Sequence, residues 1–215
     1  IPAERNPLNH LLHTISQRRY RIGFLATAML SLGGFMMMPW GSAFSINNLH
    51  VTVHQLPILF MVAGISALVI MPVIGKLSDK VDKFTIFSFA SLWMIIMVVI
   101  YTNLSAVPFW VVITMNIAFM MGIMSRMVPA MALTSSLPQM QDRGAYMSIS
   151  ASLQQMAGGV AAAVGGIIVV QKTQYSPLEH YNTLGYVIVC ITFISIFLVY
   201  RVSKLIKESM HKSVL

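Results

Sequence analysis

The stretch LPILFMVAGISALVIMPVIGKLSDKVDK, residues 56–83, contains the two features that decide the fold. From Leu56 to Gly75 the sequence is apolar and has no Asp, Glu, Lys or Arg. A helix of about twenty such residues crosses a bilayer core about 30 Å thick, because it satisfies its own backbone hydrogen bonds where water is absent. From Lys76 to Lys83 the sequence becomes charged, which is typical of a connection at the membrane surface. The stretch therefore predicts a spanning helix followed by a short basic connection.

The whole chain has this apolar character. Apolar residues make up 57% of it and charged residues 9%, and its mean hydropathy is +0.76, whereas a soluble domain carries about a quarter charged residues. The apolar residues occur in long runs and do not alternate with polar ones, which favours spanning helices over barrel strands. We expect an all-α membrane protein with six spans, at Ile22–Phe44, Leu56–Gly75, Phe84–Asn103, Phe109–Met131, Tyr146–Val170 and Tyr181–Tyr200.

The distribution of basic residues predicts the orientation. If the N-terminus is cytoplasmic, twelve of the fourteen Lys and Arg residues lie in cytoplasmic segments, Lys172 lies outside and Arg126 lies within a span. Lys and Arg collect in cytoplasmic loops, so both termini are expected there. The net charge of +8 then reflects topology, and no nucleic-acid partner is expected. We expect residues 1–21 to form a cytoplasmic linker or surface helix, 22–200 a membrane bundle and 201–215 a basic cytoplasmic tail, in a multi-pass protein of the cell membrane.

The connection Gly75–Lys83 resembles the signature loop of the major facilitator superfamily, G-x-L-a-D-R/K-x-G-R/K. The matching residues are Gly75, Leu77, Ser78, Asp79, Lys80 and Lys83. Asp82 stands where the family has glycine, which suits the second, more degenerate copy of this loop between helices eight and nine.

The residues of this connection also suggest a gating role without the resemblance. We expect Gly75 to let two helices approach closely and Asp79 to accept hydrogen bonds from a neighbouring helix N-terminus. Lys80 and Lys83 are expected to hold the connection at the inner face. The alternative is a plain basic surface loop, which would explain the lysines but not Gly75 and Asp79 at this spacing.

A second stretch, SRMVPAMALTSSLPQMQDRGAYMSISASLQQMAGGVAAAVGGII at residues 125–168, is similar to helices ten and eleven of drug-efflux-type facilitators. The resemblance implies that the chain is the C-terminal half of a twelve-helix transporter, with inverted three-helix repeats at Ile22–Asn103 and Phe109–Arg201. The expected partners are the missing N-terminal half, membrane lipid and a small-molecule substrate.

Arg126 is the one charge placed within an expected span, where an unsatisfied charge costs at least about 2.5–3.5 kcal/mol. It either reaches toward the inner interface or serves as an anion-binding or gating group, and the sequence leaves both open. Met and aromatic residues suit varied apolar ligands, although core packing is their commoner use. The candidates for the substrate cavity are Arg126, Asn116, Phe119, Met36, Trp40, Asn47 and Gln154.

Small residues in the fifth expected span suggest a packing face. Gly158, Gly159, Ala162 and Gly166 would let helix backbones pack closely in lipid. Gln154 lies one turn earlier, and bonding to another helix is the alternative to substrate contact.

The resemblance implies a secondary active transporter that works by alternating access, and it favours proton-coupled export of an amphipathic compound. None of the six Asp and Glu or six His residues lies in an expected span, so a proton-coupling group is expected in the missing half. Uptake of a sugar or an organic anion, with Arg126 as the anion's partner, and a six-helix channel or assembly subunit are the alternatives. No catalytic constellation lies within the spans, so we expect no enzyme activity, cofactor or metal. Cys190 is the single cysteine, which excludes an internal disulfide.

Overall fold

The computed structural model describes residues 7–214, with side chains over residues 11–209. Within this range six helices are long and apolar enough to cross a membrane, as the sequence predicts. Together with shorter elements they are α1 (Pro7–Ser16), α2 (Arg18–Phe35), η1 (Met38–Trp40), α3 (Gly41–Asn47), α4 (Leu56–Lys80), α5 (Lys83–Thr102), α6 (Phe109–Ser135), α7 (Arg143–Ile168) and α8 (Tyr181–Val214). The side chains of Arg5 and Lys212, which we counted as cytoplasmic, lie outside the described residues.

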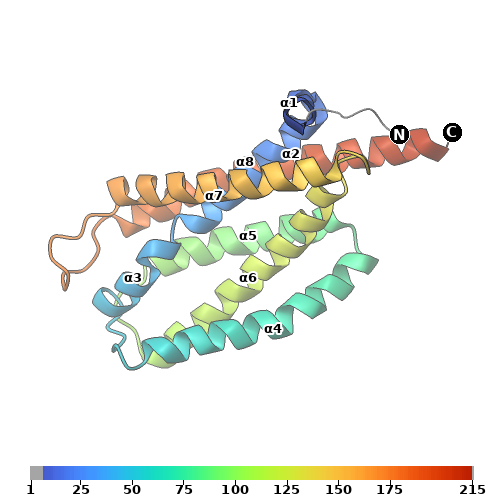
Figure 1. Cartoon of the computed structure of the whole chain (residues 1–215). Helices are drawn as coiled ribbons and strands as arrows, with labels where there is room; N and C mark the ends of the chain where they lie inside the picture. Colours follow the sequence, from blue (N-terminus) through green and yellow to red (C-terminus); the bar gives the residue numbers. More distant parts are fainter. Residues whose placement is uncertain (1–6, 215) are drawn as a thin grey trace.

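The packing of the six spans confirms the two expected repeats (Figure 1). α2 packs against α7 and α8, α6 packs against α4 and α5, and α5 packs against α8. If α2 is exchanged with α6, α4 with α7 and α5 with α8, each of these contacts becomes another contact of the same set. The members of each exchanged pair are three spans apart in the sequence, so they cross the bundle in opposite directions. The arrangement is therefore that of inverted three-helix repeats.

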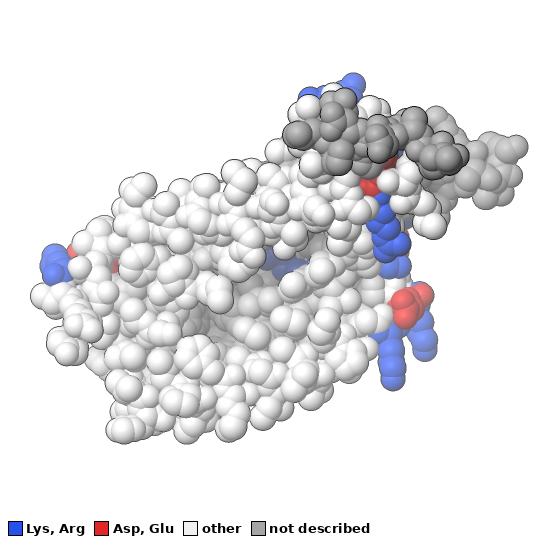
Figure 2. Space-filling model, viewed as in Figure 1, with Lys and Arg blue, Asp and Glu red and all other residues white. Residues whose placement is uncertain are grey.

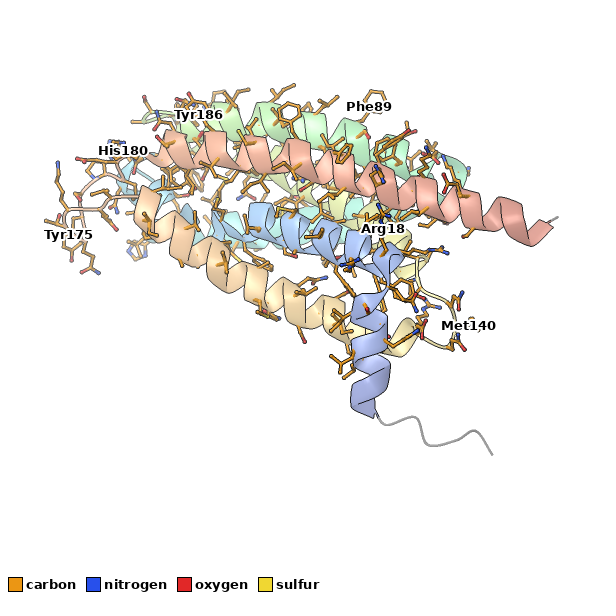
Figure 3. The ribbon with its side chains drawn as sticks, turned by 90° about the horizontal axis from the view of Figure 1, so that it is seen from above. Arg18, Phe89, Met140, Tyr175, His180 and Tyr186 are labelled. Atoms are coloured by element: carbon orange, nitrogen blue, oxygen red, sulfur yellow. The ribbon has the colours of Figure 1, made fainter. Side chains whose placement is uncertain are left out.

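Charged side chains gather at one end of the bundle, which we call the basic end (Figure 2). Here α4 passes into α5, α6 passes into α7, and the long helix α8 continues beyond its neighbours. α1 lies across this end, roughly perpendicular to the spans (Figures 1 and 3). Within the segment expected to be a linker or surface helix, α1 ends at Ser16 and α2 starts at Arg18.

Aromatic packing joins α2 to α7 near the basic end. The Tyr146 ring stacks on Phe24 at 4.7 Å between centroids and meets Tyr20 edge-on at 5.5 Å. Tyr146 also covers Gly23, where an added Cβ would collide with the Tyr146 hydroxyl and lie 2.6 Å from Leu137 Cδ2. The two helices can approach this closely because residue 23 has no side chain.

A buried carboxylate fixes the connection between α6 and α7 to the start of α2. The Tyr20 hydroxyl donates to Asp142 Oδ2 at 2.9 Å and accepts the backbone N–H of Gln139 at 3.1 Å. The Gln17 side-chain amide reaches the same carboxylate oxygen at 3.5 Å. Asp142 is only 2% exposed, so the connection between α6 and α7 is anchored inside the bundle.

The predicted span Ile22–Phe44 is not one helix. α2 ends at Phe35, and η1 with Pro39 separates it from α3. Proline lacks the N–H that an uninterrupted helix needs, and the helix is broken around Pro39.

The last helix, α8, is longer than the predicted span Tyr181–Tyr200. α8 continues through Arg201 to Val214, so the predicted basic tail is helical and joined to the last span. Val202 is fully buried, and Leu205 and Ile206 pack against the core beside Tyr20 and Phe24. These three apolar side chains of the α8 extension therefore pack as part of the bundle.

We expect Gly23→Ala to destabilise the protein by about 1–3 kcal/mol, because the new methyl group would displace the Tyr146 ring. Thermal unfolding of the detergent-purified protein should show a lower midpoint. Gly159→Ala is the matched control, since no heavy atom lies within 4 Å of its Cβ position. If both variants unfold at the parent temperature, the close approach of α2 and α7 is contradicted.

Candidate functional site

Arg126 lies on α6, away from the ends of the bundle. Figure 2 shows a small blue patch inside a hollow in the middle of one face, separate from the charged ends. The Arg126 guanidinium lies 5.8 Å from the centre of the Phe87 ring, within the range of a cation–π contact. Its Nε is buried and has no hydrogen-bond partner.

Arg126 has no carboxylate partner among the described residues. The described acids are Asp79, Asp82, Asp142, Glu179 and Glu208, and each lies in a connection or in the last turns of a helix. Glu179 pairs with Lys172, and Asp82 pairs with Lys207.

The face of α6 that carries three of the cavity candidates turns toward the bundle interior. Asn116, Phe119 and Arg126 are all half-buried, and the Phe119 ring lies 5.1 Å from that of Tyr101 on α5. Asn116 Oδ1 is buried without a hydrogen-bond partner. Ten residues separate Asn116 from Arg126, or about 15 Å along the helix axis. The face thus offers an acceptor and a cation at different depths, with apolar side chains between them.

A groove of about 470 Å³ runs between the broken end of α2 and α7. Its lining is mostly apolar, with one side-chain amide, and consists of Phe35, Met38, Pro39, Gln155, Gly158, Gly159 and Ala162. Gln155 was not among our candidates, and its neighbour Gln154 does not line the groove. A helix wheel anchored on the groove-lining glycines would have selected Gln155, which precedes Gly159 by one turn.

The candidates from the first span separate in the structure. Met36 is 1% exposed and belongs to the core, so it does not line an open cavity. The Asn47 side chain donates to the Gln174 carbonyl at 3.4 Å, at the end opposite the basic end. Trp40 is half-buried, and its Nε1 has no partner. Of the three, Trp40 has the unpartnered polar atom that a ligand could bind, Met36 packs in the core, and Asn47 contacts the connection between α7 and α8.

The packing face of α7 differs from the one we predicted. Ala157, Ala161 and Gly165 are the small residues buried against neighbours. Gly159 and Gly166 are exposed. Gly158 remains close to its neighbour, with a Cβ position 3.3 Å from the Phe35 ring, and Ala162 is half-buried in the groove wall.

The signature connection is mostly helical. Gly75, Asp79 and Lys80 belong to α4, and Lys83 is the first residue of α5. No heavy atom of a neighbour lies within 4 Å of the Gly75 Cβ position, so the close helix approach expected there is not seen in the described residues.

Asp82, not Asp79, caps a helix here. The Asp82 carboxylate accepts the backbone N–H of Thr85 at 3.2 Å and pairs with Lys207 Nζ at 2.8 Å. The Lys207 hydrogen bond lowers the pKa of Asp82 below its ordinary value. The residue that departs from the family motif therefore joins the α4–α5 connection to α8.

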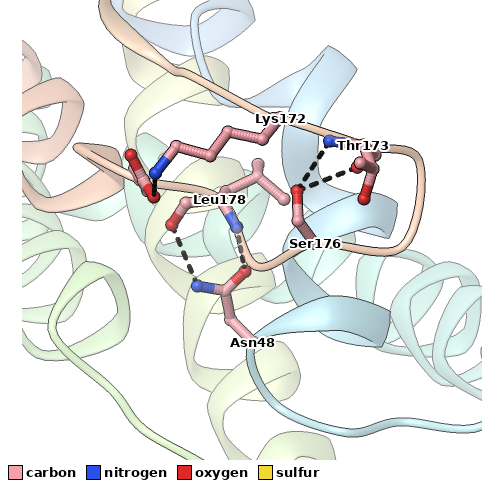
Figure 4. Close-up of polar contacts among 6 residues, drawn as sticks. Asn48, Lys172, Thr173, Ser176 and Leu178 are labelled. Carbon is pink, nitrogen blue, oxygen red and sulfur yellow. Dashed lines mark hydrogen bonds and ion pairs between the residues drawn. The ribbon is translucent and has the colours of Figure 1, made fainter.

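A separate polar clip closes the opposite end of the bundle (Figure 4). The Asn48 side chain donates to the Leu178 carbonyl at 3.1 Å and accepts the Leu178 N–H at 2.8 Å. Lys172 and Glu179 form an exposed ion pair at 2.7 Å in the same connection, and the lysine lowers the pKa of Glu179. The clip ties the end of α3 to the connection between α7 and α8.

We expect the α2–α7 groove to be reached by water and the outer side of α8 to face lipid. In a Cys190→Ser background, Gln155→Cys should react with a water-soluble, membrane-impermeant maleimide, because the reactive thiolate forms where water is present. Phe197→Cys, on an exposed apolar position of α8, should react far more slowly. Equal labelling of the two thiols, measured by mass spectrometry, would contradict an aqueous groove.

The described residues contain no group of three or more His, Cys, Asp or Glu side chains that could hold a metal ion. A search of curated proteins gave no match. The chain matches the family model of the Major Facilitator Superfamily over residues 23–212, which overlaps all six spans. This multi-pass membrane chain therefore belongs to the Major Facilitator Superfamily, a family of membrane transporters.

Proposed function

We propose that this chain is the C-terminal six-helix half of a secondary active transporter that moves a small molecule by alternating access. The observation that carries the proposal is the exposure of α4 and α7, which occupy equivalent places in the two repeats. Of the 25 residues of α4, only Leu59 and Ser78 are buried. α7 exposes Gln155 and Gly159 beside the groove. A second six-helix half would cover these sides and enclose a path between the halves.

The break in α2 supports a gating movement. α2 and α3 meet at Pro39, so the α3 end can tilt without breaking a continuous helix. The two ends are held by different contacts, Tyr20 with Asp142 at the basic end and Asn48 with Leu178 at the other. Each set can open while the other remains closed, as alternating access requires.

The proposed orientation places the basic end in the cytoplasm. The positive-inside rule supports this assignment, because Lys76, Lys80, Arg143 and Lys204 lie at that end and Lys172 lies at the other.

Proton-coupled export of an amphipathic compound is our leading assignment of activity. It rests on the likeness of residues 125–168 to drug-efflux facilitators. The described acids lie outside the middle of the spans, which supports a coupling carboxylate in the other half.

The first test uses the intact protein from its native membrane, reconstituted in proteoliposomes. Export coupled to protons predicts that an imposed pH gradient drives ethidium, a fluorescent amphipathic cation, and that a protonophore abolishes the transport. Its intact mass should be about twice the 23.8 kDa of this chain. A mass near 23.8 kDa would contradict the half-transporter assignment, and ethidium movement that ignores the gradient would contradict proton coupling.

An organic anion is the second candidate substrate, and the unpaired Arg126 favours it. If Arg126 binds the anion, Arg126→Ala should lower uptake of an anionic substrate by at least about tenfold, because a desolvated charge pair is lost. Transport of a cationic or neutral compound should continue. Arg126→Lys is the control, because it keeps the positive charge at this position and should retain more anion uptake than Arg126→Ala. Loss of all transport in Arg126→Ala, with normal yield and unfolding temperature, would instead indicate gating.

A further inference from the structure

A second groove, of about 290 Å³, lies between the start of α5 and the extension of α8. Its lining combines aromatic rings with charged groups and consists of Phe84, Tyr200, Ser203, Lys204, Lys207 and Glu208. It is far in sequence from the α2–α7 groove and from Arg126, and no step of the proposed transport uses it.

The depth of this groove matches the headgroup region of a bilayer. α8 begins at Tyr181, and nineteen residues of helix, about 29 Å, separate it from Tyr200. A hydrocarbon core is about 30 Å thick, so Lys204 and Lys207 lie just beyond it. The rings of Phe84 and Tyr200, 5.4 Å apart between centroids, then lie at the boundary where aromatic side chains are favoured.

The surface beside the groove is suited to acyl chains. On α5, Phe89 is 71% exposed and points away from the bundle in Figure 3. On α8, Phe197 is 59% exposed and lies one turn before Tyr200, which lines the groove. α5 and α8 pack side by side, so these side chains extend the groove along the membrane-facing surface of the helix pair.

The charged groups present ammonium donors to a phosphate. Lys204 is exposed at the rim. The Lys207 ammonium is held by Asp82 at 2.8 Å, and this single contact leaves further N–H donors free. Glu208 is an opposing charge on the lining, whereas Lys83 and Arg201, adjacent in sequence to the two rings, add positive charge nearby.

We propose that this groove binds the phosphate headgroup of an anionic glycerophospholipid from the leaflet at the basic end. The phosphate lies between Lys204 and Lys207, the glycerol lies on the Phe84–Tyr200 ring pair, and the acyl chains follow α5 and α8 past Phe89. Basic pockets between spanning helices on the cytoplasmic side bind such headgroups. The assignment to the cytoplasmic leaflet rests on the proposed orientation, but the binding itself does not depend on the transport activity.

Native mass spectrometry of the intact, detergent-purified transporter tests this site. Phosphatidylglycerol is added in parallel with phosphatidylcholine of the same acyl chains, and the dissociation constant of the first bound lipid is measured. Each basic residue near a membrane surface adds about fivefold to the binding of anionic lipid. Lys204→Gln should therefore weaken phosphatidylglycerol binding about fivefold, and Lys204→Gln with Lys207→Gln about thirtyfold. Lys76→Gln, on an exposed lysine of α4 at the same end, is the matched control and should change little.

Glu208→Gln should change the affinity for phosphatidylglycerol in the opposite direction. Removal of this carboxylate should strengthen phosphatidylglycerol binding severalfold, whereas a site for a zwitterionic aminophospholipid would lose affinity. Glycerol 3-phosphate at millimolar concentration should not displace the lipid, because it lacks the acyl chains. The proposal is overturned if the double variant binds phosphatidylglycerol as tightly as the parent, if Glu208→Gln weakens binding, or if glycerol 3-phosphate competes fully.

Discussion

The close contact of α2 with α7 is the constraint on which the rest of the bundle depends. Between apolar helices in lipid, van der Waals contact and hydrogen bonds supply much of the attraction, so backbones must come close. Tyr146 lies over Gly23 near the basic end, and the Trp40 indole lies within 2.9 Å of the Gly165 Cβ position farther along. These two contacts fix the contact between α2 and α7 near both of its ends. Because α2 also packs on α8, they position the helices of the second repeat relative to the first.

α4 lies at the edge of the bundle, although it packs along α6 as extensively as α2 packs along α7. Its equivalent contact, with α6, involves no glycine of α4 in close approach, because neither Gly64 nor Gly75 has a neighbouring heavy atom within 4 Å of its Cβ position. Figure 1 shows α4 at the edge of the bundle, with α6 crossing between it and α5. An edge helix with few buried side chains leaves most of its surface free for lipid or for a new partner.

The sequence predicted the features that depend on hydropathy. All six spans follow from the length of the apolar runs, whereas a proline alone does not fix a break, because Pro72 and Pro129 lie inside α4 and α6. The packing face of α7 was missed because small residues occupy every side of that helix between Gly158 and Gly166, so no periodicity selects one. Asp142 was missed because its burial depends on Tyr20, which is 122 residues away.

The two ends of the bundle are closed by chemically different contacts, and this difference bears on how they can open. At the basic end, the Tyr20–Asp142 bond is buried, so breaking it exposes a carboxylate and a hydroxyl that need water or a new donor. At the opposite end, the Asn48–Leu178 bonds are partly buried, and Leu178 is 5% exposed and belongs to the apolar core. Opening either end therefore leaves polar groups that need water or a new partner, and the basic end has the additional cost of a buried carboxylate.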